Sequence, residues 1–197
     1  MLDTHRGWFK GLEAKTAKVF AVFPITPNHY TSLSIVSVLV CDYFLIARCY
    51  WPALVFFALA AGLDFVDGAV ARSKNLSTEK GAYWDTIADR YVDAAILFGL
   101  LFAGLPELYF PVYVWIFLSL FGSMMTTYAK AAAKEKGLSD AELKGGLMSR
   151  AERLIIFAVV IVSLNYYPAL ASFLLAALAI LTNVTAMQRV KEALLLK

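Results

Sequence analysis

The sequence predicts an all-α integral membrane protein, in which six transmembrane helices follow an N-terminal interfacial amphipathic helix. Sixty per cent of the 197 residues are apolar and only 17% are charged, whereas a soluble domain carries roughly 25% charged residues. Mean hydropathy is +0.67. Apolar runs close to the roughly 20 residues that cross a bilayer recur along the chain. They predict a single membrane domain, residues 1–197, with a six-helix bundle over 31–187. The predicted spans are residues 31–48, 51–70, 81–103, 107–132, 151–165 and 168–187.

Residues 1–22, ahead of the first span, are predicted to form a helix along the membrane surface. The stretch lacks the uninterrupted apolar core of a signal peptide. Its large side chains instead recur at helical spacing, which is typical of an interfacial amphipathic helix. The positions on this stripe are Trp8, Leu12, Thr16, Val19 and Phe20.

The basic residues predict the orientation of the spans. Of the 18 lysines and arginines, all but Arg48 lie in or beside the N-terminus, residues 72–90, residues 130–153 or the C-terminus. An even number of spans places these regions on one side, which the positive-inside rule assigns to the cytoplasm. We therefore expect a multi-pass plasma-membrane protein with both termini inside. The net charge of +3 is then a membrane-surface feature, and no nucleic-acid partner is expected.

The two cysteines, Cys41 and Cys49, lie in the first span and directly after it. Two cysteines on one helix cannot form a zinc site alone, so we interpret them as small apolar residues.

Four aspartates lie near the cytoplasmic ends of the second and third spans. Helical geometry places Asp64 and Asp67 on one stripe with Gly68 and Ala71, and it places Asp85 and Asp89 on another with Gly81. A lone charge within a span costs roughly 2.5–3.5 kcal/mol even on the lenient insertion scale. Clustered carboxylates repel one another until a cation neutralises them, and hard divalent cations are their natural partners. The plainer alternative is that the acids form salt bridges on two neighbouring helices. Only Arg72 and Arg90 are near enough in sequence to pair with these four carboxylates.

The depth of the aspartates separates three function classes. Asp64 and Asp89 each lie roughly 12 Å from a cytoplasmic helix end, and the outer halves of the spans hold almost no ionisable groups. A divalent-cation transporter needs a polar route to the far side. An enzyme that joins a soluble substrate to a lipid substrate needs a site at this boundary. A structural protein with a metal staple would explain the acids but not the basic residues.

Phosphate-binding features surround the acids. Gly81 at a helix start exposes backbone N–H groups, Arg72 supplies a forked cation, and Ser77 and Thr78 add hydroxyls.

A second group of residues, which is basic, lies at the cytoplasmic ends of later spans. Ser149 and Glu152 fit a capping box, which would put two arginines in a first helical turn, where cations are disfavoured and anions favoured. This basic group is Lys130, Arg150, Arg153 and Arg189.

The aspartates and their neighbours form the pattern D-x2-D-G-x2-A-R-x8-G-x3-D-x3-D without departure. The chain therefore resembles the CDP-alcohol phosphotransferases, which transfer a phosphatidyl-type group from a CDP-lipid to an alcohol and release CMP. The resemblance implies that Asp64, Asp67 and Asp85 bind two divalent cations, Mg²⁺ or Mn²⁺. Asp89 would complete the cluster and act as general base. A homodimer is typical of the family. The residues implied to bind the CDP-lipid are Pro27, Asn28, Thr31, Gly68, Arg72, Thr78 and Gly81.

Three further segments bear on the acceptor alcohol. Tyr128-Ala-Lys130, Gly145-Gly146-Leu-Met-Ser-Arg150-Ala-Glu-Arg153 and Gln188-Arg189 resemble the phosphatidylinositol-phosphate and archaetidylinositol-phosphate synthase branch. That resemblance implies inositol phosphate as acceptor, with its phosphate held by Lys130, Arg153 and Arg189. The chain departs from the branch at Ala151, where proline is usual, and at Ser149, where an acid is common. Glycerol 3-phosphate and a neutral alcohol such as serine remain alternative acceptors.

Overall fold

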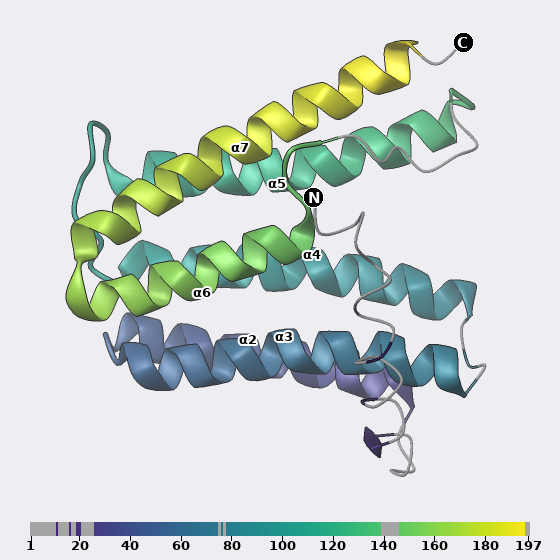
Figure 1. Cartoon of the computed structure of the whole chain (residues 1–197), viewed down its shortest axis with the longest axis horizontal. Helices are drawn as coiled ribbons and strands as arrows, with labels where there is room; N and C mark the ends of the chain where they lie inside the picture. The colour runs from purple at the N-terminus through teal and green to yellow at the C-terminus, as the bar shows by residue number, and fades with distance from the viewer. Residues whose placement is uncertain are drawn as a thin grey trace. The chain divides into compact units, whose positions relative to one another are not determined.

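The computed structural model describes residues 26–74, 76, 78–138 and 146–195, together with Gly11, Thr16, Val19 and Phe20. Within this part of the chain the structure is all-α, and its one β-type pairing is an isolated bridge between Leu108 and Phe110. The helices are α2 (Pro27–Ile46), α3 (Tyr50–Ser73), α4 (Glu79–Phe102), α5 (Val112–Glu135), α6 (Arg150–Tyr166) and α7 (Pro168–Leu195) (Figure 1).

Four of these helices are long and apolar enough to cross a membrane, namely α2, α3, α5 and α7. Helix α4 carries the charged residues Asp85, Asp89, Arg90 and Asp93, and α6 has only 17 residues. The all-α membrane architecture is therefore supported, whereas spanning by α4 and α6 remains a prediction. The predicted N-terminal amphipathic helix falls mostly outside the described residues.

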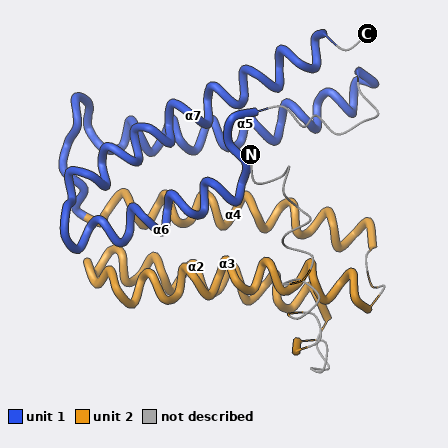
Figure 2. Tube along the Cα trace, viewed as in Figure 1, with its two compact units in different colours: residues 1, 104–197 blue, residues 2–103 orange. Residues whose placement is uncertain are grey.

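The chain divides into two compact units, residues 2–103 and residues 104–197, here called the N-terminal and C-terminal units (Figure 2). In the N-terminal unit α2 packs against both α3 and α4. Tyr30 of α2 packs with Leu63, Val66 and Val70 of α3, and its hydroxyl donates to the Phe20 carbonyl at 3.2 Å. These contacts hold the start of α2 against the second half of α3.

Helix α2 begins earlier than the predicted span. Thr26 is its N-cap and Pro27 lies in the first turn, where the missing N–H of proline costs no hydrogen bond. Pro27 and Asn28, which the sequence places just before the span, therefore form its first turn. Thr31 follows one turn later, on the buried face.

The outer half of α2 contains a buried acid, although the outer halves of the predicted spans were expected to hold almost no ionisable groups. Asp42 is 5% exposed and lies roughly 16 Å along the helix from Thr31. A Cβ on Gly99 of α4 would come within 2.5 Å of the Asp42 Oδ1 atom. Glycine at position 99 therefore permits the close approach of α4 to this carboxyl group.

In the C-terminal unit α7 packs against α5 and α6. The Asn183 amide donates to the Leu118 carbonyl at 2.8 Å, and the Thr126 hydroxyl lies 3.3 Å from the Thr182 carbonyl. A Cβ on Gly122 would come within 2.8 Å of the Asn183 backbone nitrogen. Small and hydroxyl-bearing residues thus let the α5 and α7 backbones approach closely, as membrane helices commonly do.

The fourth span, predicted to start at residue 107, starts later in the structure, at Val112 of α5. Residues 107–111 are not helical, because Leu108 pairs with Phe110 and Pro111 is the N-cap of α5. The Trp115 ring N–H donates to the Leu108 carbonyl at 2.9 Å and fixes this connection against the helix.

Candidate active site

Three of the predicted metal ligands meet between α3 and α4. Asp64, Asp67 and Asp85 each offer a carboxylate oxygen, and these oxygens all lie within 4.8 Å of one another. Asp67 is buried, and the other two are half-buried. Three carboxylates at this separation need a positive partner, and an all-oxygen donor set suits Mg²⁺ or Mn²⁺. The residues therefore fit a divalent-cation site.

Helix α2 supports this group of acids directly. The Thr31 hydroxyl donates to Asp67 Oδ2 at 2.5 Å, and both side chains are buried. Thr31 is predicted to bind the CDP-lipid, and in the structure its hydroxyl contacts a candidate metal ligand. The two residues are 36 positions apart, so no local pattern could have paired them.

A cavity of about 160 Å³ opens beside Asp67 and Asp85. All the residues predicted to bind the CDP-lipid lie on its wall, at the start of α2, the end of α3 and the start of α4. They are Pro27, Asn28, Thr31, Gly68, Arg72, Thr78 and Gly81. The structure thus brings three separate sequence segments to one opening next to the acids.

Two glycines shape this cavity. A Cβ on Gly68 would lie 3.1 Å from an Arg72 guanidinium nitrogen, so the missing side chain leaves room for the arginine along α3. A Cβ on Gly81 would lie 3.1 Å from Thr78 Oγ1 and 3.5 Å from Asn28 Oδ1. The Gly81 N–H, expected to bind phosphate, already donates to Thr78 Oγ1 at 3.0 Å as part of the α4 N-cap.

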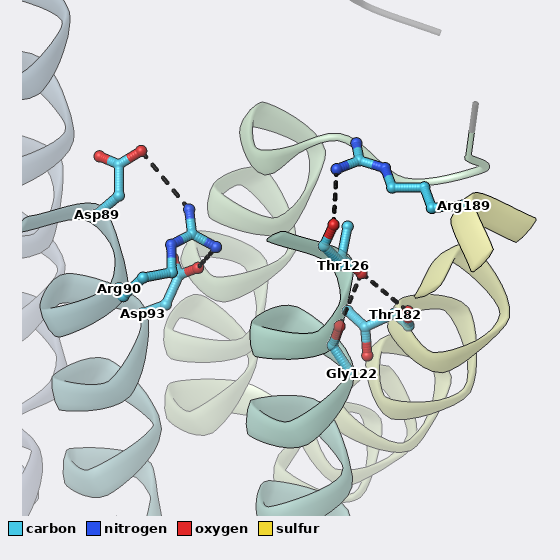
Figure 3. Close-up of polar contacts among 7 residues, drawn as sticks. All are labelled: Asp89, Arg90, Asp93, Gly122, Thr126, Thr182 and Arg189. Carbon is cyan, nitrogen blue, oxygen red and sulfur yellow. Dashed lines mark hydrogen bonds and ion pairs between the residues drawn. The ribbon is translucent and has the colours of Figure 1, made fainter. Parts of the chain in front are cut away.

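The fourth aspartate, Asp89, stands outside the group of three among the described residues. Its Oδ2 lies 3.6 Å from one Arg90 nitrogen, and the other end of that guanidinium lies 3.5 Å from Asp93 Oδ2 (Figure 3). Asp93 was not predicted as a site residue, although it extends the i, i+4 stripe of Asp85 and Asp89 by one step. The role of Asp89 as a fourth metal ligand remains a prediction.

The predicted basic group lies on the C-terminal unit. Helix α6 begins at Arg150 behind a complete capping box, in which the Glu152 carboxylate accepts from the Ser149 N–H at 2.7 Å. Arg153, one turn into this helix, is 3% exposed. On α7, Arg189 donates to the Thr126 carbonyl of α5 at 3.0 Å (Figure 3). Lys130 is half-buried one turn after Thr126.

Two residues of α7 that were not predicted as site residues hold the segment before α6. The Gln188 side chain accepts from the Leu147 N–H at 3.0 Å, and the Thr185 hydroxyl accepts from the Met148 N–H at 3.1 Å. Both come from α7, next to Arg189. Gly146 has φ +132°, and a Cβ there would come within 2.5 Å of Thr185 Cγ2. Gly145, quoted in the same motif, lies outside the described residues.

Similar proteins were found by sequence and by structure. A family model described as CDP-alcohol phosphatidyltransferase matches residues 24–186. The archaetidylinositol phosphate synthase of Pyrococcus horikoshii is 34% identical over 195 residues, which is 98% of this chain and 96% of the relative. The bifunctional IPC transferase and DIPP synthase of Aquifex aeolicus is 33% identical over 83% of this chain, but this match spans only 38% of that protein.

Among solved structures, the phosphatidylinositol phosphate synthase of Mycobacterium tuberculosis in complex with manganese and citrate superposes with a TM-score of 0.80. Sequence identity is 25%, and the match covers 93% of this chain and 89% of the other. The resemblance read from the aspartate pattern is thereby confirmed. The chain belongs to the CDP-alcohol phosphatidyltransferase family and is a membrane-embedded phosphotransferase.

Proposed function

We propose that this enzyme transfers a phosphatidyl-type group, diacyl or archaeol, from a CDP-lipid to inositol phosphate and releases CMP. The buried Arg153, in the first turn of α6, is the observation that carries the choice of acceptor. A helix N-terminus favours an anion, and a guanidinium placed there can add a forked pair of charge-assisted hydrogen bonds to a phosphate. A phosphorylated alcohol supplies such an anion, whereas a neutral alcohol does not. The names of the Pyrococcus and Mycobacterium relatives favour inositol phosphate over glycerol 3-phosphate.

On the donor side, Asp64, Asp67 and Asp85 would hold two divalent cations, Mg²⁺ or Mn²⁺. Such ions neutralise a diphosphate and stabilise the charge that develops during phosphoryl transfer. Arg72 lies on the wall of the adjacent cavity, where its fork can pair with diphosphate oxygens. Asn28 and Thr78 add polar groups at the same opening, where the nucleotide part of the CDP-lipid would bind.

Asp89 would accept the proton of the acceptor hydroxyl. The hydroxyl oxygen then attacks the lipid-bearing phosphorus, the bond between that phosphorus and the CMP oxygen breaks, and CMP leaves. Lys130, Arg150, Arg153 and Arg189 would hold the phosphate that the acceptor already carries. We further infer six transmembrane helices in the plasma membrane, with both termini and the active site on the cytoplasmic side. The distribution of basic residues supports this orientation. We also infer a homodimer, which is typical of the family.

A panel of acceptors tests the proposal. CMP release from CDP-lipid should be fastest with inositol phosphate and slow with free inositol, glycerol 3-phosphate and serine. Arg153→Gln should raise the KM for inositol phosphate by one to two orders of magnitude, because a charge-assisted hydrogen bond contributes about 1.5–3 kcal/mol. The CDP-lipid KM should stay unchanged. Lys134→Gln is the matched control, because Lys134 is exposed in the last turn of α5. Equal use of free inositol would refute the assignment of the acceptor but leave the enzyme class intact.

A further inference from the structure

Hydrogen bonds from three consecutive backbone N–H groups hold the chain just before α6. The Leu147 N–H donates to the Gln188 side chain at 3.0 Å, and the Met148 N–H donates to the Thr185 hydroxyl at 3.1 Å. The third N–H, that of the N-cap residue, donates to the capping box of α6 itself. The first turn of α6 is therefore held from two sides, by its own capping box and by two side chains of α7.

The two contacts with α7 differ in burial. Thr185 is 1% exposed and Met148 is 5% exposed, whereas Gln188 and Leu147 are exposed. A buried N–H that loses its acceptor finds no water in its place, so the bond to Thr185 contributes more than the exposed one. The Thr185 hydroxyl donates its own proton to the Leu181 carbonyl at 2.8 Å, which leaves its lone pairs for the Met148 N–H.

The same face of α7 carries one of the basic residues assigned to the acceptor phosphate. Thr185, Gln188 and Arg189 are spaced i, i+3 and i+4, so they share one face of the helix. Arg189 in turn donates to the Thr126 carbonyl of α5 at 3.0 Å (Figure 3). A Cβ on Gly146 would lie 2.5 Å from Thr185 Cγ2 and 3.7 Å from Arg189 Nε. The segment before α6 therefore passes directly over both residues.

We propose that Thr185 and Gln188 are positioning residues of the acceptor site. They fix the start of α6, and with it the place of Arg150 and Arg153 relative to Arg189. The inference rests on the proposed function, in which these arginines hold the phosphate of inositol phosphate. Charge-assisted hydrogen bonds depend steeply on distance and angle, so a displaced start of α6 would weaken every contact that this helix makes with the phosphate.

The experiment measures kcat and both KM values for CMP release by the full-length protein in detergent. Thr185→Val keeps the branched shape, removes the acceptor for the Met148 N–H and should raise the inositol-phosphate KM about tenfold. The kcat at saturating inositol phosphate and the CDP-lipid KM should stay within about twofold of wild type, because the donor side is untouched. Thr185→Ser keeps the hydroxyl and should behave as wild type. Gln188→Met removes only the exposed bond and should raise the inositol-phosphate KM about threefold.

The alternative is that Thr185 only stabilises the packing of α6 on α7. In that case Thr185→Val would lower the melting temperature and leave the inositol-phosphate KM unchanged, which overturns the proposal. Thr182→Val is the matched control. Thr182 is also 1% exposed on α7, and within the described residues its hydroxyl donates to two carbonyls of its own helix, at 2.9 and 3.1 Å. Both KM values should be normal in this variant, and a rise equal to that of Thr185→Val would refute a specific role for Thr185.

A double-variant cycle tests whether Thr185 acts through the arginines of α6. In Arg153→Gln, which has lost one of the positioned groups, Thr185→Val should raise the inositol-phosphate KM by a smaller factor than it does in the wild type. The same factor in both backgrounds contradicts the proposal. If Thr185→Val does not fold, Gln188→Met decides, and an unchanged inositol-phosphate KM in that variant overturns the proposal.

The wild type tests the proposed function separately. If it releases no CMP with inositol phosphate, the proposed function fails whatever the variants do. If it turns over normally and both Thr185→Val and Gln188→Met keep the wild-type KM for inositol phosphate, only the positioning role fails.

Discussion

Thr31 offers a direct test of how the metal site is built. Its hydroxyl donates to Asp67 Oδ2 at 2.5 Å, with Thr31 3% exposed and Asp67 5% exposed. Thr31→Val keeps the branched shape and removes only the donor. A hydrogen bond to a charged group contributes about 1.5–3 kcal/mol. Because roughly 1.4 kcal/mol corresponds to a tenfold change, we expect Mn²⁺ affinity to fall about ten- to a hundredfold.

The measurement is a Mn²⁺ titration of the substrate-free protein in detergent, followed by the CDP-lipid KM at saturating Mn²⁺. Thr31→Ser retains the hydroxyl and should stay within a few-fold of wild type. If Thr31→Val binds Mn²⁺ normally but shows a raised CDP-lipid KM, Thr31 contacts the nucleotide and the reasoning from Asp67 is wrong. A thermal melt of both variants verifies that each is folded.

Three further outcomes follow from the geometry. Asp85→Asn should abolish CMP release while the protein stays folded in the membrane, and chelation with EDTA should do the same to the wild type; substantial turnover in either case would rule out metal catalysis. Asp89→Asn should retain Mn²⁺ and CDP-lipid binding yet fail to transfer, as single-turnover CMP release would show; loss of binding with a normal transfer rate would make it a ligand. Gly146→Ala should raise the KM for inositol phosphate more than that for CDP-lipid, because its φ of +132° and the Thr185 methyl 2.5 Å from a Cβ both disfavour a side chain; equal effects on both KM values would contradict a local role.

The group of metal ligands was predictable because its members lie on two consecutive helices at helical spacing. Asp64 and Asp67 share a stripe on α3, and Asp85 lies one turn after Gly81 on α4. The Ser149–Glu152 capping box was equally local, since both partners lie within one helical turn. Patterns that repeat within a single helix carry their geometry in the sequence.

The contacts that orient these residues were not predictable, because they depend on how helices pack. Thr31 reaches Asp67 across 36 positions, and Gln188 reaches Leu147 across 41. The i, i+3 contact of Arg90 with Asp93 was local, but a sequence cannot say which of several acids an arginine will choose. The start of α5 was misplaced because the apolar residues 108–110 prolong the hydrophobic run without forming helix.

The attachment of the Gly146–Met148 segment to α7 has a consequence for protein engineering. The backbone N–H groups of Leu147 and Met148 donate hydrogen bonds to the side chains of Gln188 and Thr185. The position of the start of α6 therefore depends on α7, which lies later in the chain. A chimera that exchanges only α6 between relatives with different acceptors would leave two backbone donors facing foreign side chains. Exchanges that carry residues 146–195 together preserve both hydrogen bonds. A chimera that is to keep the position of the start of α6 should therefore exchange that whole block.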